Sequence, residues 1–243
     1  GDTGEGKMPE PEVLLSYILR ELAHEKDMKG LKVCVTAGPT RETIDPVRFI
    51  SNRSTGKMGF ALAKNAMERG ADVTLVSGPV ELKDVPFVKM VHVESARQMF
   101  EAVTKEAETA DIIVKAAAVA DYRPAVVADE KIKKKDGDMS IALERTDDII
   151  GTLGKTKRDN LFLCGFSMET EHMLENSKAK LEKKNLDMII ANNVKVKGAG
   201  FGTDTNVVTL ITKDEIKELP IMSKEDVADE IFNNILANRK GIV

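Results

Sequence analysis

Residues 31–40 are LKVCVTAGPT, and residues 51–63, after what we expect to be a long loop, are SNRSTGKMGFALA. The first stretch is short, apolar and rich in β-branched residues, as in a buried strand, whereas the second has the apolar spacing of a helix. Gly56 and Gly59 stand where the last two glycines of a dinucleotide-binding turn would place backbone N–H groups facing an anion. Close packing of the helix on the strand would require the same glycines, so both interpretations stay open.

From residue 31 onward, apolar runs alternate with amphipathic runs, and capping signals at Ser95 and Ser223 mark two helix starts. This alternation predicts an α/β protein with a Rossmann-like, doubly wound, mostly parallel sheet. Residues 121–146 interrupt the pattern, and their Asp136-Gly137 turn signal predicts a β-hairpin excursion from the sheet. We expect strands at 31–37, 72–77, 88–93, 111–117, 161–166, 187–191 and 207–212, and helices at 9–24, 58–69, 96–109, 148–157, 170–184 and the C-terminus.

The composition restricts the partners and the compartment of the protein. The 243 residues include 36 Lys and Arg against 40 Asp and Glu, a formal net charge of -4, which gives no electrostatic basis for binding nucleic acid or a membrane surface. No apolar run approaches the roughly 20 residues of a membrane span, and the acidic N-terminus is unlike a signal peptide. Cys34 and Cys164 lie in apolar runs, so we expect two unpaired core cysteines and a cytoplasmic protein.

The end of the fourth expected strand, residues 115–121 with the sequence KAAAVAD, is a candidate ligand site. Open α/β sheets bind ligands at the carboxyl ends of their strands, and small alanines let a substrate approach the backbone. Asp121 could hold Mg²⁺ or a ribose hydroxyl there. It could equally serve only to fix the turn before Tyr122, and the residues leave both alternatives open.

Two groups of lysines are further candidates. Residues 131–135, KIKKK, lie beside a flexible turn and suit a lid that closes on a polyphosphate, although a solvated hairpin face has the same composition. Lys180 and Lys184 follow Phe166 and are spaced four residues apart, so that their ammonium groups could share one phosphate chain. Lysines near the end of a helix also occur for helix-dipole reasons alone.

Several enzyme classes find no support in the chain. The sequence has no Walker A or Gly-x-Ser-x-Gly pattern, and none of its three histidines pairs with a cysteine or carboxylate at metal-ligand spacing. No acidic residue ends the second strand, where Ser77-Gly78-Pro79 stands, so a plain NAD-dependent dehydrogenase is disfavoured. Tyr17 and Tyr122 both lack the lysine four residues on that a short-chain oxidoreductase normally shows.

Eight segments taken together resemble the phosphopantothenate-cysteine ligase family, the synthetase half of bifunctional bacterial coenzyme A biosynthesis proteins. They occur in the family's order, from residue 31 to the C-terminus: TAGPTRE, DPVRFISNRSTGKMG, VTLVSGP, AAAVADYRP, KIKK, GFSMET, KKNLD and GFGTDTN. The opening GDTGEGKMPEPE is similar to the end of the flavin-dependent decarboxylase domain that precedes this ligase. The resemblance therefore implies a decarboxylase remnant and linker at residues 1–30 and a ligase domain at residues 31–243, without FMN.

The resemblance implies an acid–amino-acid ligase that does not use the ATP-grasp fold. In this family 4'-phosphopantothenate is activated by CTP with Mg²⁺ to an acyl-cytidylate, releasing pyrophosphate, and the amine of cysteine then displaces CMP. Bacterial members generally use CTP and eukaryotic ones ATP. Because the opening residues resemble the decarboxylase domain that is fused to the bacterial ligases, the resemblance favours CTP for this chain. Family members pair through the sheet excursion, which implies a homodimer.

The same resemblance implies a role for each candidate residue. Asn52 would be catalytic, its amide donating a hydrogen bond to the mixed anhydride, and Lys131 would neutralise charge on the phosphates. Asp121 would lie by Mg²⁺ and the ribose. The implied nucleotide-binding residues are Gly38, Lys115, Ala116, Ala117, Asp121, Lys131, Asp147, Asp148, Ile149, Ile150, Phe166, Lys180 and Lys184, and the implied substrate-binding residues are Asn52, Ala117 and Ala118.

Two segments depart from the family's pattern. Residues 146–148 are Thr-Asp-Asp where relatives usually have Asn-Pro-Asp, and residues 191–193 are Ala-Asn-Asn where many have Ala-Asn-Asp. The alternatives to a ligase are an NAD(P)-dependent Rossmann oxidoreductase and a non-catalytic nucleotide-binding module. A mere binding module would have no need of a second substrate pocket.

Overall fold

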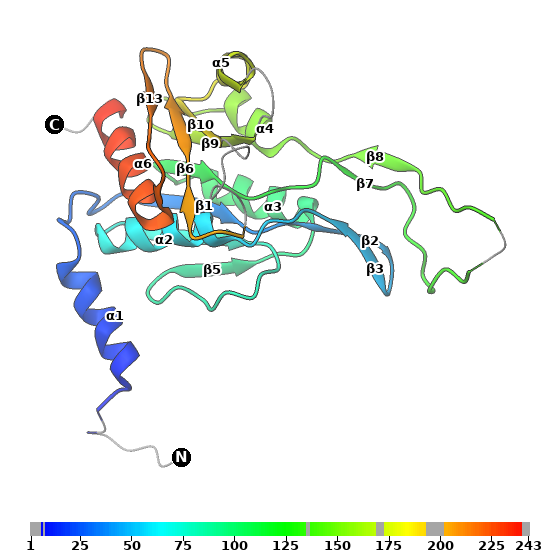
Figure 1. The fold of residues 1–243 in the computed structure, drawn as a ribbon, viewed down its shortest axis with the longest axis horizontal. Helices are drawn as coiled ribbons and strands as arrows, with labels where there is room; N and C mark the ends of the chain where they lie inside the picture. The colour runs from blue at the N-terminus through cyan, green and yellow to red at the C-terminus, as the bar shows by residue number, and fades with distance from the viewer. Residues whose placement is uncertain (1–5, 7, 135–136, 169–172, 193–201, 240–243) are drawn as a thin grey trace.

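An eight-stranded sheet forms the centre of the computed structural model, which describes residues 6, 8–134, 137–168, 173–192 and 202–239 (Figure 1). Its strand order is β13-β12-β10-β9-β6-β1-β4-β5. The six strands from β10 to β5 are parallel, and β12 and β13 are antiparallel additions at one edge. This is the expected doubly wound, mostly parallel sheet. The strands are β1 (Lys32–Ala37), β4 (Asp72–Ser77), β5 (Lys89–His92), β6 (Ile112–Lys115), β9 (Phe162–Met168), β10 (Met188–Asn192), β12 (Val208–Ile211) and β13 (Ile216–Glu218).

Helices cover both faces of the sheet and divide the core into two layers. Helices α2 and α6 pack on one face, where Leu62 and Phe232 are fully buried against β1 and its neighbours. Helices α3 and α4 pack on the other face, where Met99 and Leu153 lie in a second apolar cluster with Leu181 of α5. The helices are α2 (Lys57–Glu68), α3 (Ala96–Ala107), α4 (Ile149–Lys155), α5 (Met173–Lys183) and α6 (Lys224–Asn238).

The two cysteines are buried and the two predicted helix caps are present, as expected from the sequence. Cys34 and Cys164 are buried and unpaired, and burial raises the pKa of the Cys34 thiol to about 12, so it stays protonated. Ser95 caps α3 in a reciprocal capping box with Gln98. The Ser223 hydroxyl accepts a hydrogen bond from the third backbone N–H of α6.

The two glycines that open α2 serve different purposes. Gly56 is the N-cap residue and has a φ of 79°, a conformation that favours glycine. A Cβ on Gly59 would stand 2.5 Å from the Cβ of Ala37, so only glycine allows α2 to pack this closely on β1. The close-packing interpretation is therefore confirmed for Gly59.

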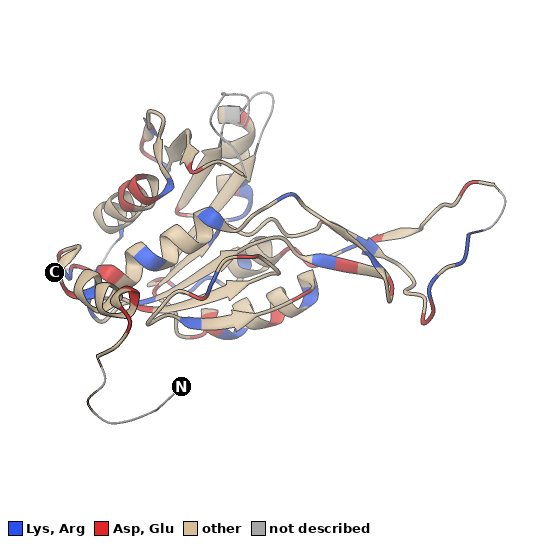
Figure 2. Ribbon diagram, turned by 60° about the horizontal axis from the view of Figure 1, so that its bottom comes forward, with Lys and Arg blue, Asp and Glu red and all other residues tan. Residues whose placement is uncertain are grey.

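Helix α1 (Pro11–Leu22) extends away from the rest of the molecule in Figure 1 and has no buried residue. Its contact with the core region includes an edge-on packing of Tyr17 against Phe87, with ring centroids 4.7 Å apart. Met28, which follows α1, is fully buried in the core. None of the described helices combines the length and the apolar character that crossing a bilayer would require. Figure 2 shows acidic and basic residues interspersed on most elements, in keeping with the small net charge.

Two antiparallel pairs project from the same side of the molecule (Figure 1). The expected long loop after β1 is wrong, because β2 (Arg41–Asp45) and β3 (Arg48–Ser51) form a hairpin. The mostly polar sequence of β2, RETID, gave no strand signal. Asp45 stabilises the turn, because its Oδ1 accepts hydrogen bonds from the backbone N–H groups of Val47 and Arg48.

The predicted excursion is confirmed as β7 (Tyr122–Pro124) paired with β8 (Leu143–Arg145). We call residues 122–134 and 137–145 the arm. Asp136, part of its expected turn, lies outside the described residues, as does most of the expected glycine-rich loop at 198–202. Two further pairings were not predicted. Strand β13 pairs antiparallel with β12, the strand expected at 207–212, and the short strands β11 (Thr205–Asn206) and β14 (Met222–Ser223) pair with each other.

Candidate active site

Two adjoining pockets open at the carboxyl ends of the parallel strands. Pocket A has a volume of about 450 Å³ and pocket B of about 410 Å³, and they share Lys115, Val119, Asp121 and Phe166. Lys115 ends β6, which lies beside β1 where the strand order reverses. Because such a switch point leaves a crevice at the strand ends, this is the expected position of a ligand site in this class of sheet.

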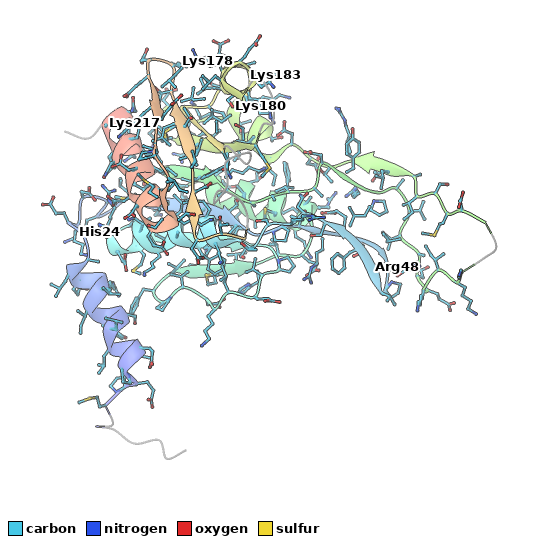
Figure 3. The ribbon with its side chains drawn as sticks, in the orientation of Figure 1. His24, Arg48, Lys178, Lys180, Lys183 and Lys217 are labelled. Carbon is cyan, nitrogen blue, oxygen red and sulfur yellow. The ribbon has the colours of Figure 1, made fainter. Side chains whose placement is uncertain are left out.

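Pocket A is lined by the start of α4 and by lysines of the α5 region. Lys184 Nζ lies 3.0 Å and 2.9 Å from the two carboxylate oxygens of Asp148, whose Oδ1 also accepts a hydrogen bond from Gly151 N–H at 3.1 Å. Burial alone would raise the pKa of Asp148, but these hydrogen bonds lower it, so the carboxylate is charged. Figure 3 labels Lys178, Lys180 and Lys183 on α5, and of these three only Lys180 lines the pocket.

Lys115 stands at the junction of the two pockets. Burial lowers the pKa of its ammonium group, and the nearby Lys184 and Lys180 lower it further, whereas the carboxylates of Asp121 and Asp148 raise it. An anionic ligand would stabilise the charged form of Lys115, because the ligand would replace lost hydration and offset the neighbouring positive charges.

Two buried threonines fix the backbone between the pockets. Thr36 Oγ1 on β1 accepts a hydrogen bond from Ala117 N–H at 3.0 Å, and Thr40 Oγ1 accepts one from Ala120 N–H at 3.0 Å. Both threonines are fully buried. The alanine-rich segment is thereby held rigidly with its small side chains lining pocket B.

Asn52 lines pocket B from the loop before α2. Its side-chain Nδ2 donates a hydrogen bond of 2.9 Å to the carbonyl of Ala118. This bond fixes which end of the amide carries the donors, and Nδ2 has a second N–H besides the one used here. An exposed neutral amide oriented in this way can donate to an oxyanion without attacking an acyl group.

Nearly all the predicted site residues come together on these pockets. Pocket A holds Lys115, Asp121, Asp147, Asp148, Ile149, Ile150, Phe166, Lys180 and Lys184. Pocket B holds Asn52, Lys115, Ala116, Ala117, Ala118, Asp121 and Phe166.

Gly38 and Lys131 do not line either pocket. Gly38 is buried against the turn after β4, where a Cβ would stand 3.1 Å from the carbonyl oxygen of Gly78. Lys131 is exposed on the arm. The next residue of the arm, Ile132, is tied to the β2–β3 hairpin: its N–H donates to Asp45 Oδ2 at 3.1 Å, and its carbonyl accepts from Arg48 at 3.0 Å. Figure 3 shows Arg48 at the far end of that hairpin.

Sequence reasoning missed part of pocket B. Lys57 and Lys224 line it from the first residues of α2 and α6, together with Asn192 and Asn206. Lys57 follows the quoted glycine turn directly and could have been found there. Lys224 is far away in the sequence, and nothing in its own segment indicates a site.

A metal site built only from protein groups is not present among the described residues, which include no group of three or more His, Cys, Asp and Glu placed to hold an ion. Asp121, Asp147 and Asp148 nevertheless line pocket A separately. This arrangement fits Mg²⁺, which commonly binds through one or two carboxylates plus substrate phosphates and keeps several waters.

The family described as "DNA/pantothenate metabolism flavoprotein C-terminal domain" matches residues 28–238. The chain belongs to this family. It is 49 % identical over 245 residues to the coenzyme A biosynthesis bifunctional protein CoaBC of Bacillus subtilis, a match that covers 99 % of this chain and 60 % of that protein. The protein of the same name from Escherichia coli K12 is 43 % identical over 239 residues, covering 97 % of this chain and 59 % of that protein.

A solved structure described as the C-terminal domain of CoaBC is similar to this one, with a TM-score of 0.74 and 44 % sequence identity. The likeness covers 86 % of this chain and 95 % of that chain. Because the chain spans about 60 % of the length of the bifunctional relatives, the similarity concerns their C-terminal part. The expected family is therefore confirmed.

Proposed function

We propose that this chain is a phosphopantothenate-cysteine ligase that activates 4'-phosphopantothenate with CTP and then couples it to cysteine. The observation that carries the proposal is the pair of pockets that meet at Lys115 and Asp121. A ligase of this kind must bring a nucleotide and an acid together at one point, and two pockets with a common wall meet that need. The relatives named for coenzyme A biosynthesis support the same reaction.

Pocket A suits the nucleotide. Its wall combines Lys115, Lys180 and Lys184, which would hold the triphosphate, with Phe166, which would contact the base. Pocket B would hold the acid, with its carboxylate at the shared wall, where it can attack the α-phosphate of CTP. The carboxylate forms the new P–O bond, pyrophosphate leaves, and the acyl-cytidylate remains between the pockets.

The acyl group would then lie beside Asn52 and the alanine-rich segment. Asn52, held by its hydrogen bond to Ala118, would donate its second N–H to the acyl-cytidylate and to the oxyanion that forms when cysteine attacks. The amine of cysteine forms the amide bond, CMP leaves with the electrons of the broken C–O bond, and the proton of the amine passes to solvent. Mg²⁺ held at Asp121 would offset charge on the phosphates.

Lys131 has a place in this reaction only if two chains combine. It lies on an arm that projects from the body of the protein (Figure 1), and it does not line the pockets of its own chain. We therefore propose a homodimer in which the arm of one chain brings Lys131 to the nucleotide of its partner. Such a shared site would follow from two-fold pairing through the exposed arm.

A nucleotide panel tests the proposed function. The protein is incubated with 4'-phosphopantothenate, cysteine and CTP or ATP, and the amide product is measured by mass spectrometry. With CTP we expect phosphopantothenoylcysteine and CMP, and with ATP much less product, as for the bacterial members of the family. We also propose that the enzyme is cytoplasmic. Reduction of NAD(P) or binding of nucleotide without product would instead favour an oxidoreductase or a binding module.

A further inference from the structure

Thr146 closes the base of the arm beside the two pockets. Its Oγ1 donates a hydrogen bond of 2.6 Å to the carbonyl of Ala120, and its backbone N–H donates one of 3.0 Å to the carbonyl of Asp121. Asp121 directly precedes β7, and Thr146 directly follows β8. These two bonds therefore join the strands of the arm at the point where both leave the body of the protein.

The body of the protein holds the same segment from the other side. The N–H of Ala120 donates to Thr40 Oγ1, whereas its carbonyl accepts from Thr146. Ala120 is only 8 % exposed, so loss of either bond would leave a buried polar group without that partner. The backbone that leads into Asp121 is thus fixed between the body and the arm.

The hydrogen bonds of Thr146 continue into the arm without a break. Strands β7 and β8 pair over all three residues of each, and beyond them the N–H of Ala125 donates to the carbonyl of Ala142 at 3.0 Å. The base of the arm and the peptide of Asp121 consequently form one hydrogen-bonded element. A shift of the arm relative to the body would move Asp121, and the Thr146 bonds resist that shift.

The position of the Asp121 carboxylate affects both pockets. Asp121 is exposed and lines pocket A as well as pocket B. Burial lowers the pKa of the neighbouring Lys115, and the carboxylate of Asp121 counters this effect. Because Thr146 closes the turn before Tyr122, the carboxylate of Asp121 does not have to hold that turn and can serve a ligand. Misplacing a binding group by about 1 Å can cost about a hundredfold in rate.

We propose that Thr146 is a positioning residue that holds Asp121 in place for the nucleotide, an inference that rests on the proposed function. The hydroxyl of Thr146 fixes the peptide between Ala120 and Asp121, so that the Asp121 carboxylate meets the nucleotide without first being ordered. Thr146 lines pocket A, but it acts through Asp121 and not by a contact of its own with the nucleotide.

A double-mutant cycle between Thr146 and Asp121 tests this role. Thr146→Val removes the hydroxyl at nearly constant volume, Thr146→Ser keeps it, and Thr146→Ala provides a second variant without it. Thr156→Val is a matched control, because the Thr156 hydroxyl also donates to a backbone carbonyl, that of Thr152, but lines neither pocket. Isothermal titration calorimetry measures the affinity for CTP in the presence of Mg²⁺, with each variant made in the wild type and in Asp121→Asn.

Thr146→Val and Thr146→Ala should weaken CTP binding at least about fivefold in the wild type and less than about twofold in Asp121→Asn, because the contact they misplace is then already lost. In the wild-type background they should also slow pyrophosphate release at least about tenfold. Thr146→Ser should restore most of the affinity, and Thr156→Val should leave it unchanged. Circular dichroism establishes that each variant is folded.

The other outcomes each exclude one step. An equal loss of affinity in the two backgrounds would mean that Thr146 contacts the nucleotide itself or acts only on stability, and the positioning role would be overturned. Wild-type affinity and pyrophosphate release in folded Thr146→Val would overturn it as well, while leaving the ligase reaction in place. A wild type that neither binds CTP nor releases pyrophosphate would instead overturn the proposed function.

Discussion

Replacing Asn52 with Asp changes one atom of the proposed catalytic group and reverses its effect. The amide Nδ2 that donates to Ala118 at 2.9 Å becomes a carboxylate oxygen, so a donor gives way to a negative charge that faces both the carbonyl and the anionic intermediate. The volume of the side chain barely changes. The variant therefore separates the chemistry of the amide from its packing.

The structural cost of this change is small and the catalytic cost is large. Losing one hydrogen bond at an exposed loop residue costs about 1 kcal/mol, which in a protein of this size lowers Tm by roughly 2–4 °C. Losing one preorganised donor at the reacting group costs at least about a hundredfold in rate. Binding of CTP should change little, because Asn52 lines pocket B and not pocket A.

Single-turnover formation of phosphopantothenoylcysteine is the appropriate assay, since it excludes product release. Enzyme in excess over CTP is mixed with both substrates and quenched at intervals, and circular dichroism confirms that the variant is folded. We expect the rate of product formation to fall at least about a hundredfold. If the folded variant ligates at the wild-type rate, Asn52 is not in the active site.

Three further predictions concern the lysines. Lys184→Gln should raise KM for CTP about tenfold by removing a charge-assisted contact, whereas Lys183→Gln, an exposed neighbour, should leave it unchanged in the same steady-state assay. Lys131→Gln should lower kcat/KM for CTP by an amount equivalent to about 2–3 kcal/mol of transition-state stabilisation. If the two sites of a dimer are shared, mixing Lys131→Gln chains with Asn52→Asp chains should restore about a quarter of wild-type activity. No recovery after subunit exchange would refute that sharing. Burial lowers the pKa of Lys115, so its charge, and with it kcat/KM for CTP, should be lost at lower pH than for an ordinary lysine. Lys115→Arg should remove this alkaline loss, because guanidinium stays protonated, and a pH profile that persists unchanged in the variant would assign the loss to another group.

The alternation of strands and helices made most of the fold predictable. Parallel strands buried on both faces leave long apolar runs such as the one containing Cys34, and the capping box at Ser95 marked the start of α3 to the residue. The β2–β3 hairpin was missed because four of the five residues of β2 are polar, and its two buried residues, Glu42 and Asp45, are themselves acidic, so β2 lacks the apolar pattern of a strand. β13 was missed because it pairs at the sheet edge with little burial.

Site residues could be predicted where a charged residue stands at or just after the end of a predicted strand. Lys115 and Asp121 lie at the end of a strand beside the switch point, where the predicted doubly wound sheet placed a ligand site, whereas the role of Asn52 came only from the family resemblance. Lys224 could not be predicted in this way, because it reaches pocket B from the start of the last helix, a placement that depends on how α6 packs beside α2. The position of Lys131 depends on the arm, whose course no local pattern specifies.

The most direct test of the account is pyrophosphate release in the absence of cysteine. A ligase that activates the acid first must cleave CTP between its α- and β-phosphates before the amine is present. With CTP, Mg²⁺ and 4'-phosphopantothenate alone, we predict a burst of pyrophosphate equal to the concentration of active sites, with the acyl-cytidylate recovered from the quenched enzyme. Strict dependence of pyrophosphate release on cysteine, with no acyl-cytidylate detected, would contradict the two-step reaction proposed for these pockets.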